Sequence, residues 1–360
     1  MRDDDSMTAR FWSARPGEDR LVCELCPRFC ALGPGQRGLC FVRKREGQRI
    51  VLDTWNRSSG FCIDPIEKKP LNHFLPGTAV LSFGTAGCNL ACKFCQNHDI
   101  SKSRETASLS QHATAAMITT AARNAGAASV AFTYNDPVIF LEYAVEVAEA
   151  VHARGLRSVA VTAGYITPAP RAEFFAAMDA ANIDLKAFSE SFYWKLTGAH
   201  LAPVLETIEY AVKETRCWVE LTTLLIPGQN DGEAEIAALA EWVLDRLGPG
   251  VPLHFSAFHP AYRMLDLPPT PPATLLRARD QARAAGLQHV YVGNLRDKAA
   301  QSSYCAGCGA LVIGREGYQI SDWGLSADGH CQSCGTRFPG RIEGPPGTWG
   351  PRRQPVRIVP

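Results

Sequence analysis

The 360-residue sequence lacks any apolar run of about 18 residues, the length that a membrane-spanning helix needs. The segment Met1–Ser6 lacks the apolar core of a signal peptide, so we expect a cytoplasmic protein. An excess of one charge is also missing, because 37 Lys and Arg stand against 36 Asp and Glu. The net charge of +1 predicts no general attraction to nucleic acid or to an anionic membrane.

Cysteine, by contrast, is abundant. In a chain of this size without an export signal, 13 cysteines are expected to bind metal rather than to form disulfides. Cys62 and Cys217 stand alone and are interpreted as small buried residues. The other eleven form three groups: Cys23, Cys26, Cys30 and Cys40; Cys88, Cys92 and Cys95; and Cys305, Cys308, Cys331 and Cys334.

Between the first and last cysteine groups, short β-branched or apolar runs alternate with longer helical patterns, which predicts a parallel α/β sheet. The expected strands are 79–83, 129–134, 157–162, 182–186, 217–223, 252–257 and 289–293. The expected helices are 113–125, 137–153, 171–180, 202–215, 233–247 and 273–285. This pattern allows either a partial (β/α)6 barrel or an open doubly wound sheet, and both place the site at the C-terminal ends of the strands.

The middle cysteine group lies in a C-x3-C-x2-C loop directly after the first expected strand. Three closely spaced thiolates can hold three irons of a [4Fe–4S] cluster and leave the fourth iron open for a substrate or cosubstrate. A zinc knuckle or three free thiols are the alternatives. Structural zinc normally needs four protein ligands, and only His98 lies near enough in sequence to be considered.

The two outer cysteine groups differ in how clearly their spacing indicates which metal they bind. Cys305, Cys308, Cys331 and Cys334 have the paired C-x2-C spacing of a zinc ribbon, with a rubredoxin-like iron site or free thiols as alternatives. The set Cys23, Cys26, Cys30 and Cys40 allows zinc or an auxiliary [4Fe–4S] cluster, and zinc or another structural metal is the favoured interpretation.

Polar side chains follow several of the expected strands. Asn135 and Asp136 after the second strand are acceptors for an ammonium group, although they also suit a turn that caps the next helix. Thr162 and Gly164 follow the third strand, where Gly164 permits a close backbone approach or only a turn.

Further along the chain, alternation places Asp184 and Lys186 on one face of the fourth strand, where they are expected to pair or to bind a ligand. The segment from Glu220 to Thr223, which includes Thr222, offers polar contacts or structural hydrogen bonds. His259 after the sixth strand is a candidate substrate contact. The charged segment Asp64–Gly77 suits either a binding loop or a solvated connector.

The cluster loop, with Phe94 before its last cysteine, resembles the signature of the radical S-adenosylmethionine (SAM) superfamily. A closer resemblance, to the AmmeMemoRadiSam-system radical SAM enzymes, spans roughly residues 21–340. That family looks like pyruvate formate-lyase activating enzymes in its barrel. The resemblance is carried by the segments 23–28, 35–38, 64–70, 88–97, 133–137, 184–186 and 226–231 and by the C-terminal ribbon. The chain departs from the pattern at Asp136, where Glu is expected, and at Ala163, where Asn is usual.

The resemblance implies an oxidoreductase-type enzyme in which Cys88, Cys92 and Cys95 hold a [4Fe–4S] cluster. SAM bound at the open iron is cleaved to a 5′-deoxyadenosyl radical, which abstracts hydrogen from a protein glycine or a metabolite. In this interpretation Asn135, Asp136, Thr162, Gly164, Asp184, Lys186 and Thr222 bind SAM. The implied partners are a flavodoxin or ferredoxin as electron donor and Memo-like and AMMECR-like proteins. A metal-rich redox sensor or scaffold without SAM turnover is the alternative.

The predicted layout has five parts. It comprises a flexible N-terminal arm (1–20), a Cys-rich module with a connector (21–76), a radical SAM partial barrel (77–300), a zinc-ribbon-like module (301–340) and a disordered Pro- and Gly-rich tail (341–360).

Overall fold

A nine-stranded, mostly parallel sheet forms the centre of the protein. The structure is a computed structural model and describes residues 7–104 and 110–358. The strand order is β16-β15-β14-β13-β12-β11-β9-β8-β20. The parallel strands are β9 (Ala79–Phe83), β11 (Ser129–Phe132), β12 (Arg157–Thr162), β13 (Ala180–Asp184), β14 (Trp218–Leu225), β15 (Leu253–Ala257) and β16 (Val290–Gly293).

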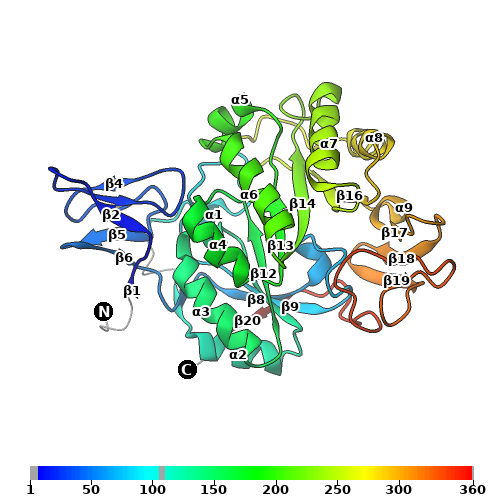
Figure 1. Cartoon of the computed structure of the whole chain (residues 1–360), viewed down its shortest axis with the longest axis horizontal. Helices are drawn as coiled ribbons and strands as arrows, with labels where there is room; N and C mark the ends of the chain where they lie inside the picture. The colour runs from blue at the N-terminus through cyan, green and yellow to red at the C-terminus, as the bar shows by residue number, and fades with distance from the viewer. Residues whose placement is uncertain (1–6, 105–109, 359–360) are drawn as a thin grey trace.

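The parallel strands follow one another in chain order without a reversal. Because crossovers between parallel strands are right-handed, an unreversed order puts all the connecting helices on one side of the sheet. These helices are α2 (Ala115–Asn124), α3 (Leu141–His152), α4 (Pro168–Ala176), α6 (Leu201–Glu214), α7 (Glu233–Leu247) and α8 (Pro272–Ala284) (Figure 1). The α/β fold class is confirmed, and the order is that of a barrel rather than of a doubly wound sheet.

The sheet carries two strands that the sequence pattern did not predict. Strand β8 (Phe61–Pro65), in the expected connector, is buried and pairs antiparallel with β9. Strand β20 (Gln354–Val356) pairs antiparallel with β8. Residues expected to form a disordered tail therefore form an edge strand instead, because β8 offers unpaired backbone groups that Gln354–Val356 satisfy. Residues 359 and 360 lie outside the described part of the chain.

The N-terminal residues are also more ordered than expected. Strand β1 (Met7–Thr8) pairs with β6 (Arg49–Leu52), which pairs with β5 (Arg43–Glu46), and β2 (Trp12–Ala14) pairs with β3 (Leu21–Cys23). Strand β4 (Ala31–Leu32) completes the second small sheet. The prediction of a flexible arm is therefore wrong for residues 7–14, whose strands pair into the Cys-rich module. Residues 1–6 lie outside the described part.

A buried ion pair docks this module on the barrel. The guanidinium of Arg43 lies 2.5 Å from the Glu142 carboxylate of α3, and both side chains are almost inaccessible to water. Glu142 also accepts a hydrogen bond from the backbone of Arg10 at 2.7 Å. Breaking such a pair would leave an uncompensated buried charge, so this ion pair holds the module in one position against α3.

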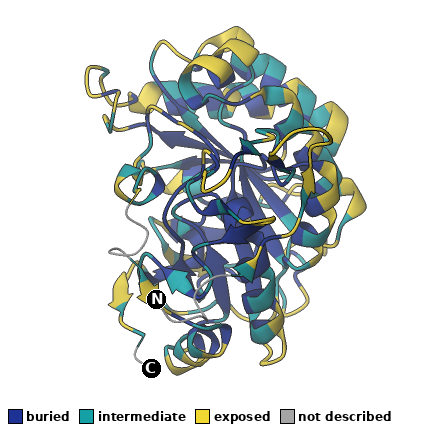
Figure 2. Cartoon of the chain, turned by 90° about the vertical axis from the view of Figure 1, so that its left-hand side faces the viewer, coloured by how far each residue is buried: buried dark blue, intermediate teal, exposed yellow. Residues whose placement is uncertain are grey.

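The C-terminal four-Cys module lies at the other end of the sheet, beyond β16 (Figure 1). Its strands are β17 (Ser303–Tyr304), β18 (Leu311–Glu316) and β19 (Gln319–Trp323). A short helix, α9 (Lys298–Gln301), connects it to the barrel. The buried residues concentrate in the central strands, as Figure 2 shows, while the outer faces of the helices are exposed.

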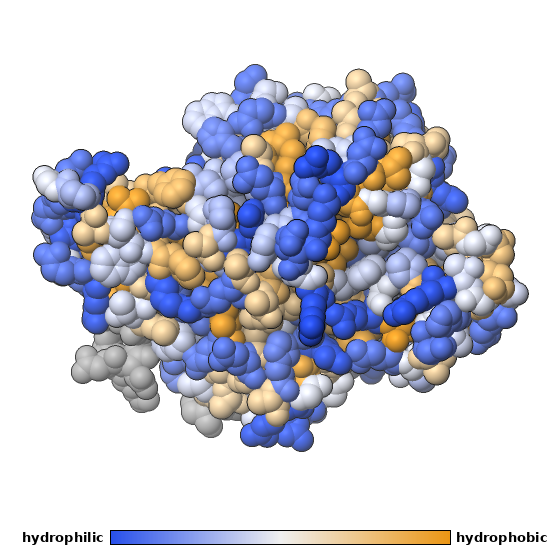
Figure 3. Space-filling view, in the orientation of Figure 1, coloured by the Kyte–Doolittle hydropathy of each residue, from blue (hydrophilic) through white to orange (hydrophobic). Residues whose placement is uncertain are grey.

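The short remaining elements are mostly connections around the barrel. They are η1 (Ile66–Lys68), α1 (His98–Ser101), η2 (Pro137–Phe140), α5 (Glu190–Phe192), η3 (Tyr193–Thr197) and the antiparallel pair of β7 (Arg57–Ser58) and β10 (Gln111–His112). On the face drawn in Figure 3, hydrophilic side chains separate several small apolar areas. Within the described residues, no helix is long and apolar enough to cross a membrane.

Candidate active site

A cavity of about 1280 Å³ lies at the C-terminal ends of the parallel strands. Pockets for one ligand usually measure about 300–1,000 Å³, so this one has room for more than one molecule. The structure brings most of the predicted site residues to its wall. These are Cys88, Cys92, Cys95, Asn135, Asp136, Thr162, Asp184, Lys186 and Thr222.

The loop with the three cysteines is tied down from several sides. The backbone amides of Ala91 and Lys93 donate to Thr197 and Leu196, at 2.8 and 2.9 Å. The ammonium of Lys102 donates to the Leu90 carbonyl at 2.6 Å. These hydrogen bonds hold the three thiols of the loop at one wall of the cavity.

Asn135 has a different role from the predicted one. Its amide nitrogen donates to the Gly87 carbonyl at 2.8 Å and to the Thr85 hydroxyl at 3.2 Å, and its oxygen accepts from the Thr85 amide at 3.3 Å. Most of its hydrogen-bonding capacity is therefore spent on the cluster loop. Asn135 is a positioning residue for that loop, although it also lines the cavity.

Asp136, by contrast, has a free oxygen. Its Oδ1 accepts from the Thr162 hydroxyl at 2.7 Å and from the Val138 amide at 3.2 Å, whereas Oδ2 is buried and has no hydrogen-bond partner. Burial raises the pKa of this carboxyl to about 6. A buried acceptor without a donor is costly, so a cationic ligand at this point would be bound favourably.

Gly164 does not line the cavity. Its φ is +65°, and a Cβ there would lie 3.0 Å from the Ile183 side chain. Its amide donates to the Thr162 hydroxyl at 3.1 Å. The glycine permits a turn that orients Thr162 and, through it, Asp136.

Asp184 and Lys186 form an ion pair of 2.9 Å at the end of β13, on the same face as their spacing predicts. Burial alone would lower the pKa of Lys186, but Asp184 and the nearby Cys92 thiol raise it above its ordinary value. Lys186 therefore supplies a lasting positive charge beside the cluster loop. Thr222, on the neighbouring strand, has a buried hydroxyl without a partner.

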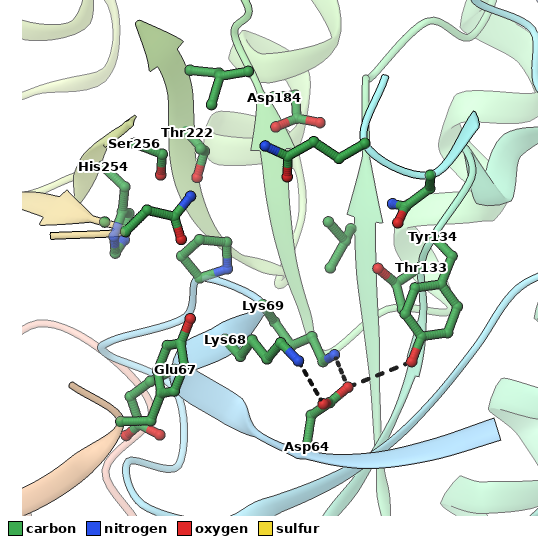
Figure 4. A pocket seen from close by; sticks show the side chains of 18 of the residues that line it. Asp64, Glu67, Lys68, Lys69, Thr133, Tyr134, Asp184, Thr222, His254 and Ser256 are labelled. Carbon is green, nitrogen blue, oxygen red and sulfur yellow. Dashed lines mark hydrogen bonds and ion pairs between the residues drawn. The ribbon is translucent and has the colours of Figure 1, made fainter. Parts of the chain in front are cut away.

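A second polar cluster lies across the cavity, on the end of β8, the segment that follows it and the loop after β11 (Figure 4). Asp64 accepts from Lys69 at 2.7 Å and from Lys68 at 3.0 Å, and the Tyr134 hydroxyl lies 3.5 Å away. Although burial opposes its charged form, the two ammonium groups hold the pKa of Asp64 below its ordinary value. The segment is thus a wall of the cavity rather than a solvated connector.

Strand β14 makes the structural hydrogen bonds that were one of the two alternatives for it, whereas β15 differs from the prediction. Glu220 is buried and accepts from the amides of Asn72 and His73, at 2.9 and 2.8 Å, and pairs with His254 at 2.7 Å. Its role is structural. His254 lines the cavity, whereas the predicted substrate contact His259 is exposed and does not. Strand β15 ends at Ala257, so His259 lies beyond the strand.

Residues from the C-terminal part of the chain also line the cavity. Arg315 and Tyr318 come from the four-Cys module, and Pro351 and Arg353 come from the segment before β20. Arg315 donates to the Asn72 carbonyl at 2.6 Å and to Ser303 at 2.8 Å, which fixes the module against the loop after β8. No sequence pattern connected these residues with the barrel.

Glu67, at the edge of the same cavity, makes stability depend on pH. Burial raises its pKa to about 7 from an ordinary 4.5, so the folded state binds the proton more tightly than the unfolded state. The contribution of Glu67 to stability is then greatest below about pH 4.5, and it is lost as the pH rises through about 7. We expect Glu67→Gln to gain about 3 kcal/mol over the wild type at pH 8 and almost nothing at pH 4.5.

Urea unfolding at the two pH values measures this difference. Glu241→Gln, at an exposed position on α7, is the matched control and should change stability little at either pH. An equal effect of Glu67→Gln at both pH values would contradict the assigned pKa.

The three cysteine groups differ in spacing. Among the described residues, one group of His, Cys, Asp or Glu side chains has all its ligand atoms within 4.8 Å of one another, namely Cys305, Cys308, Cys331 and Cys334. Four sulfurs around one zinc at 2.3 Å lie about 3.8 Å apart. The sulfurs of Cys305 and Cys334 lie 3.6 Å apart, and those of Cys308 and Cys331 lie 3.8 Å apart. This group could hold zinc as it stands.

The loop thiols at the cavity are not gathered at that spacing. Sulfurs that bind separate irons of one cluster lie further apart than sulfurs that share one zinc ion. Three thiols facing a large cavity, with a buried carboxylate oxygen and an ammonium beside them, therefore suit a three-ligand cluster with a bound cosubstrate. Fold and site together define a cluster-binding α/β enzyme.

Residues 83–240 match the sequence model "Radical SAM superfamily", so the chain carries a radical SAM domain. A protein of Methanocaldococcus jannaschii named "Uncharacterized protein MJ0808" is 36% identical over 322 residues, which cover 89% of this chain and 96% of the relative.

Solved structures with a similar fold include a radical SAM methyltransferase from Sphaerobacter thermophilus. It is 16% identical, with a TM-score of 0.49, and the match covers 85% of this chain and 81% of the other. Another is a domain of a pyruvate-formate lyase-activating enzyme from Bacteroides vulgatus, 16% identical with a TM-score of 0.41, covering 46% and 99%.

Proposed function

We propose that the protein cleaves SAM reductively and uses the resulting radical to abstract hydrogen from a small polar molecule. The observation that carries the proposal is the single cavity that holds both the three loop thiols and the charged cluster around Asp64. When bound, a [4Fe–4S] cluster on Cys88, Cys92 and Cys95 supplies one electron to the sulfonium of SAM.

The chain's own residues have distinct parts in this proposal. The buried free oxygen of Asp136 accepts from the ammonium group of SAM, and Thr162 fixes the orientation of that carboxylate. Lys186 offers a positive charge for a carboxylate, paired with Asp184. Thr222 offers a buried hydroxyl without a partner. These roles for the residues at the strand ends follow from their geometry and charge.

The substrate is proposed to be small because the C-terminal part of the chain adds walls to the cavity. Arg315 and Tyr318 of the four-Cys module, and Pro351 and Arg353, line it together with the strand ends. A protein loop that carried a target glycine would have to fit beside them. Lys68, Lys69 and Asp64 line the part of the cavity opposite the SAM residues, so both charged and hydrogen-bonding groups of a polar metabolite would find partners there.

The finer family assignment remains a proposal. The motifs of the AmmeMemoRadiSam system imply Memo-like and AMMECR-like partner proteins, an oxidoreductase activity in the cytoplasm and a flavodoxin or ferredoxin as electron donor. The relative from M. jannaschii matches 89% of the chain, which supports a shared architecture over most of its length.

The test is anaerobic incubation of iron- and sulfide-reconstituted protein with SAM and dithionite, with 5′-deoxyadenosine and methionine quantified by mass spectrometry. We expect slow formation of both products alone and faster formation with a low-molecular-weight fraction of cell extract. Faster formation only with the protein fraction would contradict a small substrate. No product from protein with an intact cluster and bound SAM would favour the redox-sensing or scaffold alternative.

Asp136 gives a prediction on SAM binding. A hydrogen bond to a charged group contributes about 1.5–3 kcal/mol, so Asp136→Asn should weaken SAM binding roughly 10- to 150-fold. Equilibrium dialysis of SAM against the reconstituted protein measures the change. Asp136→Glu keeps the charge and should retain most of the affinity. The exposed Asp245→Asn on α7 is the control; equal affinities for all four proteins would remove Asp136 from the SAM site.

A further inference from the structure

The N-terminal cysteines gather around one small cavity although they come from separate parts of the module. Cys23 lies on β3, Cys26 and Cys30 follow it, and Cys40 precedes β5, and all four line the same cavity. The backbone amide of Cys23 donates to the Cys30 carbonyl at 3.0 Å. A Cβ at Gly38 would lie 3.7 Å from the sulfurs of both Cys30 and Cys40, so a residue without a side chain stands between them.

These sulfurs are not gathered as closely as the ligands of one zinc ion. In the described chain, the sulfurs of Cys305, Cys308, Cys331 and Cys334 all lie within 4.8 Å of one another. Neither the N-terminal group nor the loop thiols are gathered in this way. The N-terminal group thus shares its wider spacing with the group assigned to an iron–sulfur cluster. Thiolates that bind four different irons require this separation, and a cavity between them is where the inorganic core would lie.

A positively charged side chain faces the same cavity. Arg28 lines it, and the Nη2 atom of Arg28 is buried without a hydrogen-bond partner. The Nε atom of Arg28 donates to the Asn89 carbonyl at 2.9 Å, so the guanidinium is fixed in place. A cluster with four thiolate ligands is anionic, and hydrogen bonds to its sulfurs are a usual way for a protein to stabilise it.

The cavity lies against the loop that holds the radical SAM cysteines. Gly87 has a φ of +86°, and a Cβ there would lie 2.0 Å from the Cys40 carbonyl oxygen. On the other side of Cys88, Asn89 lines the N-terminal cavity and binds Arg28. Both chain neighbours of Cys88 thus contact the N-terminal module. At the far side, Phe29 is 54% and Leu39 49% exposed, so the module also reaches the surface.

We propose that Cys23, Cys26, Cys30 and Cys40 bind a second [4Fe–4S] cluster, which passes electrons to the cluster on Cys88, Cys92 and Cys95. The second cluster would take one electron from a low-potential one-electron donor and give up one electron, and no bond would form or break there. The site itself is independent of the proposed function, whereas its role as a relay rests on it.

Metal content separates this proposal from a zinc module. In the full chain with Cys88, Cys92 and Cys95 all replaced by Ala, the N-terminal cysteines are untouched. After anaerobic purification and reconstitution we expect about four irons and one zinc per chain, with the paramagnetic signal of a reduced cluster after dithionite. About two zincs and no iron would overturn the proposal. The wild type should hold about eight irons and one zinc per chain. About four irons and two zincs in the wild type would also overturn the proposal of a second cluster.

The relay is tested on Cys40→Ala, with Cys217→Ala as the control because Cys217 stands outside all three groups. We expect Cys40→Ala to lose about half of its iron. The Cys40→Ala variant should still form 5′-deoxyadenosine with dithionite, because a small reductant can reach the loop cluster directly. It should form none with reduced flavodoxin, which would need the second cluster as a relay. Equal rates with both reductants would overturn the relay. If neither the wild type nor the variant formed product while the triple variant kept its iron, the proposed function would fail and the second cluster site would stand.

Discussion

Replacing Cys92 by alanine is expected to reduce 5′-deoxyadenosine formation to the level seen without enzyme. Cys92 is the most buried of the three loop thiols, at 8% exposed, and it faces the cavity beside Lys186. With one ligand lost, two thiolates remain for a cluster that needs three. Iron content, the visible absorption of the cluster and product formation should therefore fall together.

The Cys217→Ala variant is the matched control for this experiment. Cys217 is also buried, but it lies at the start of β14, and its thiol contacts the carbonyl of Trp218. We expect it to cost a modest amount of stability and to leave SAM cleavage unchanged. Full SAM cleavage by Cys92→Ala with normal iron content would overturn the assignment of the cluster to this loop.

The second large effect is expected at the four-Cys module that follows the barrel. Cys331→Ala removes one of four sulfurs set at zinc spacing, and a site with three ligands binds zinc far more weakly. Metal binding contributes about 10 kcal/mol or more to the folding of small zinc modules. The core of this module is small, with Val312, Ile313, Leu325 and Phe338 as its main buried residues. We therefore expect the module to unfold while the barrel stays folded.

Zinc content and limited proteolysis measure this outcome, with cleavage expected first between residues 303 and 340. The control is Ser333→Ala, an exposed position between Cys331 and Cys334. Since Arg315 leaves the cavity when the module unfolds, binding of the proposed substrate should weaken even where the cluster remains intact. A variant that keeps its zinc, or that loses zinc but resists protease like the wild type, would contradict a structural zinc site.

The barrel was predictable because its strands depend on local pattern. Ala79–Phe83 and Arg157–Thr162 are strands with the predicted bounds, since short β-branched or apolar runs between helical patterns have few alternatives. Strand β20 was not predictable, because Gln354–Val356 contains a proline and no apolar pattern. Its pairing depends on the free edge of β8, a partner nearly 300 residues earlier in the chain.

The site shows the same division. The spacing of the loop cysteines and the alternation of Asp184 and Lys186 placed these residues correctly, because both depend on neighbours in sequence. Spacing could not tell that Asn135 would bind the cluster loop and leave Asp136 with a free oxygen. Nor could spacing tell that His254 would line the cavity and His259 would not, because this depends on where β15 ends.

The residues that line the cavity from the C-terminal side have one more consequence, which concerns the order of synthesis. Arg315, Tyr318 and Arg353 all come after the last barrel strand, so a ribosome produces the strand ends and the cysteine loop before this wall of the cavity. The site is therefore complete only once the C-terminal residues have been made.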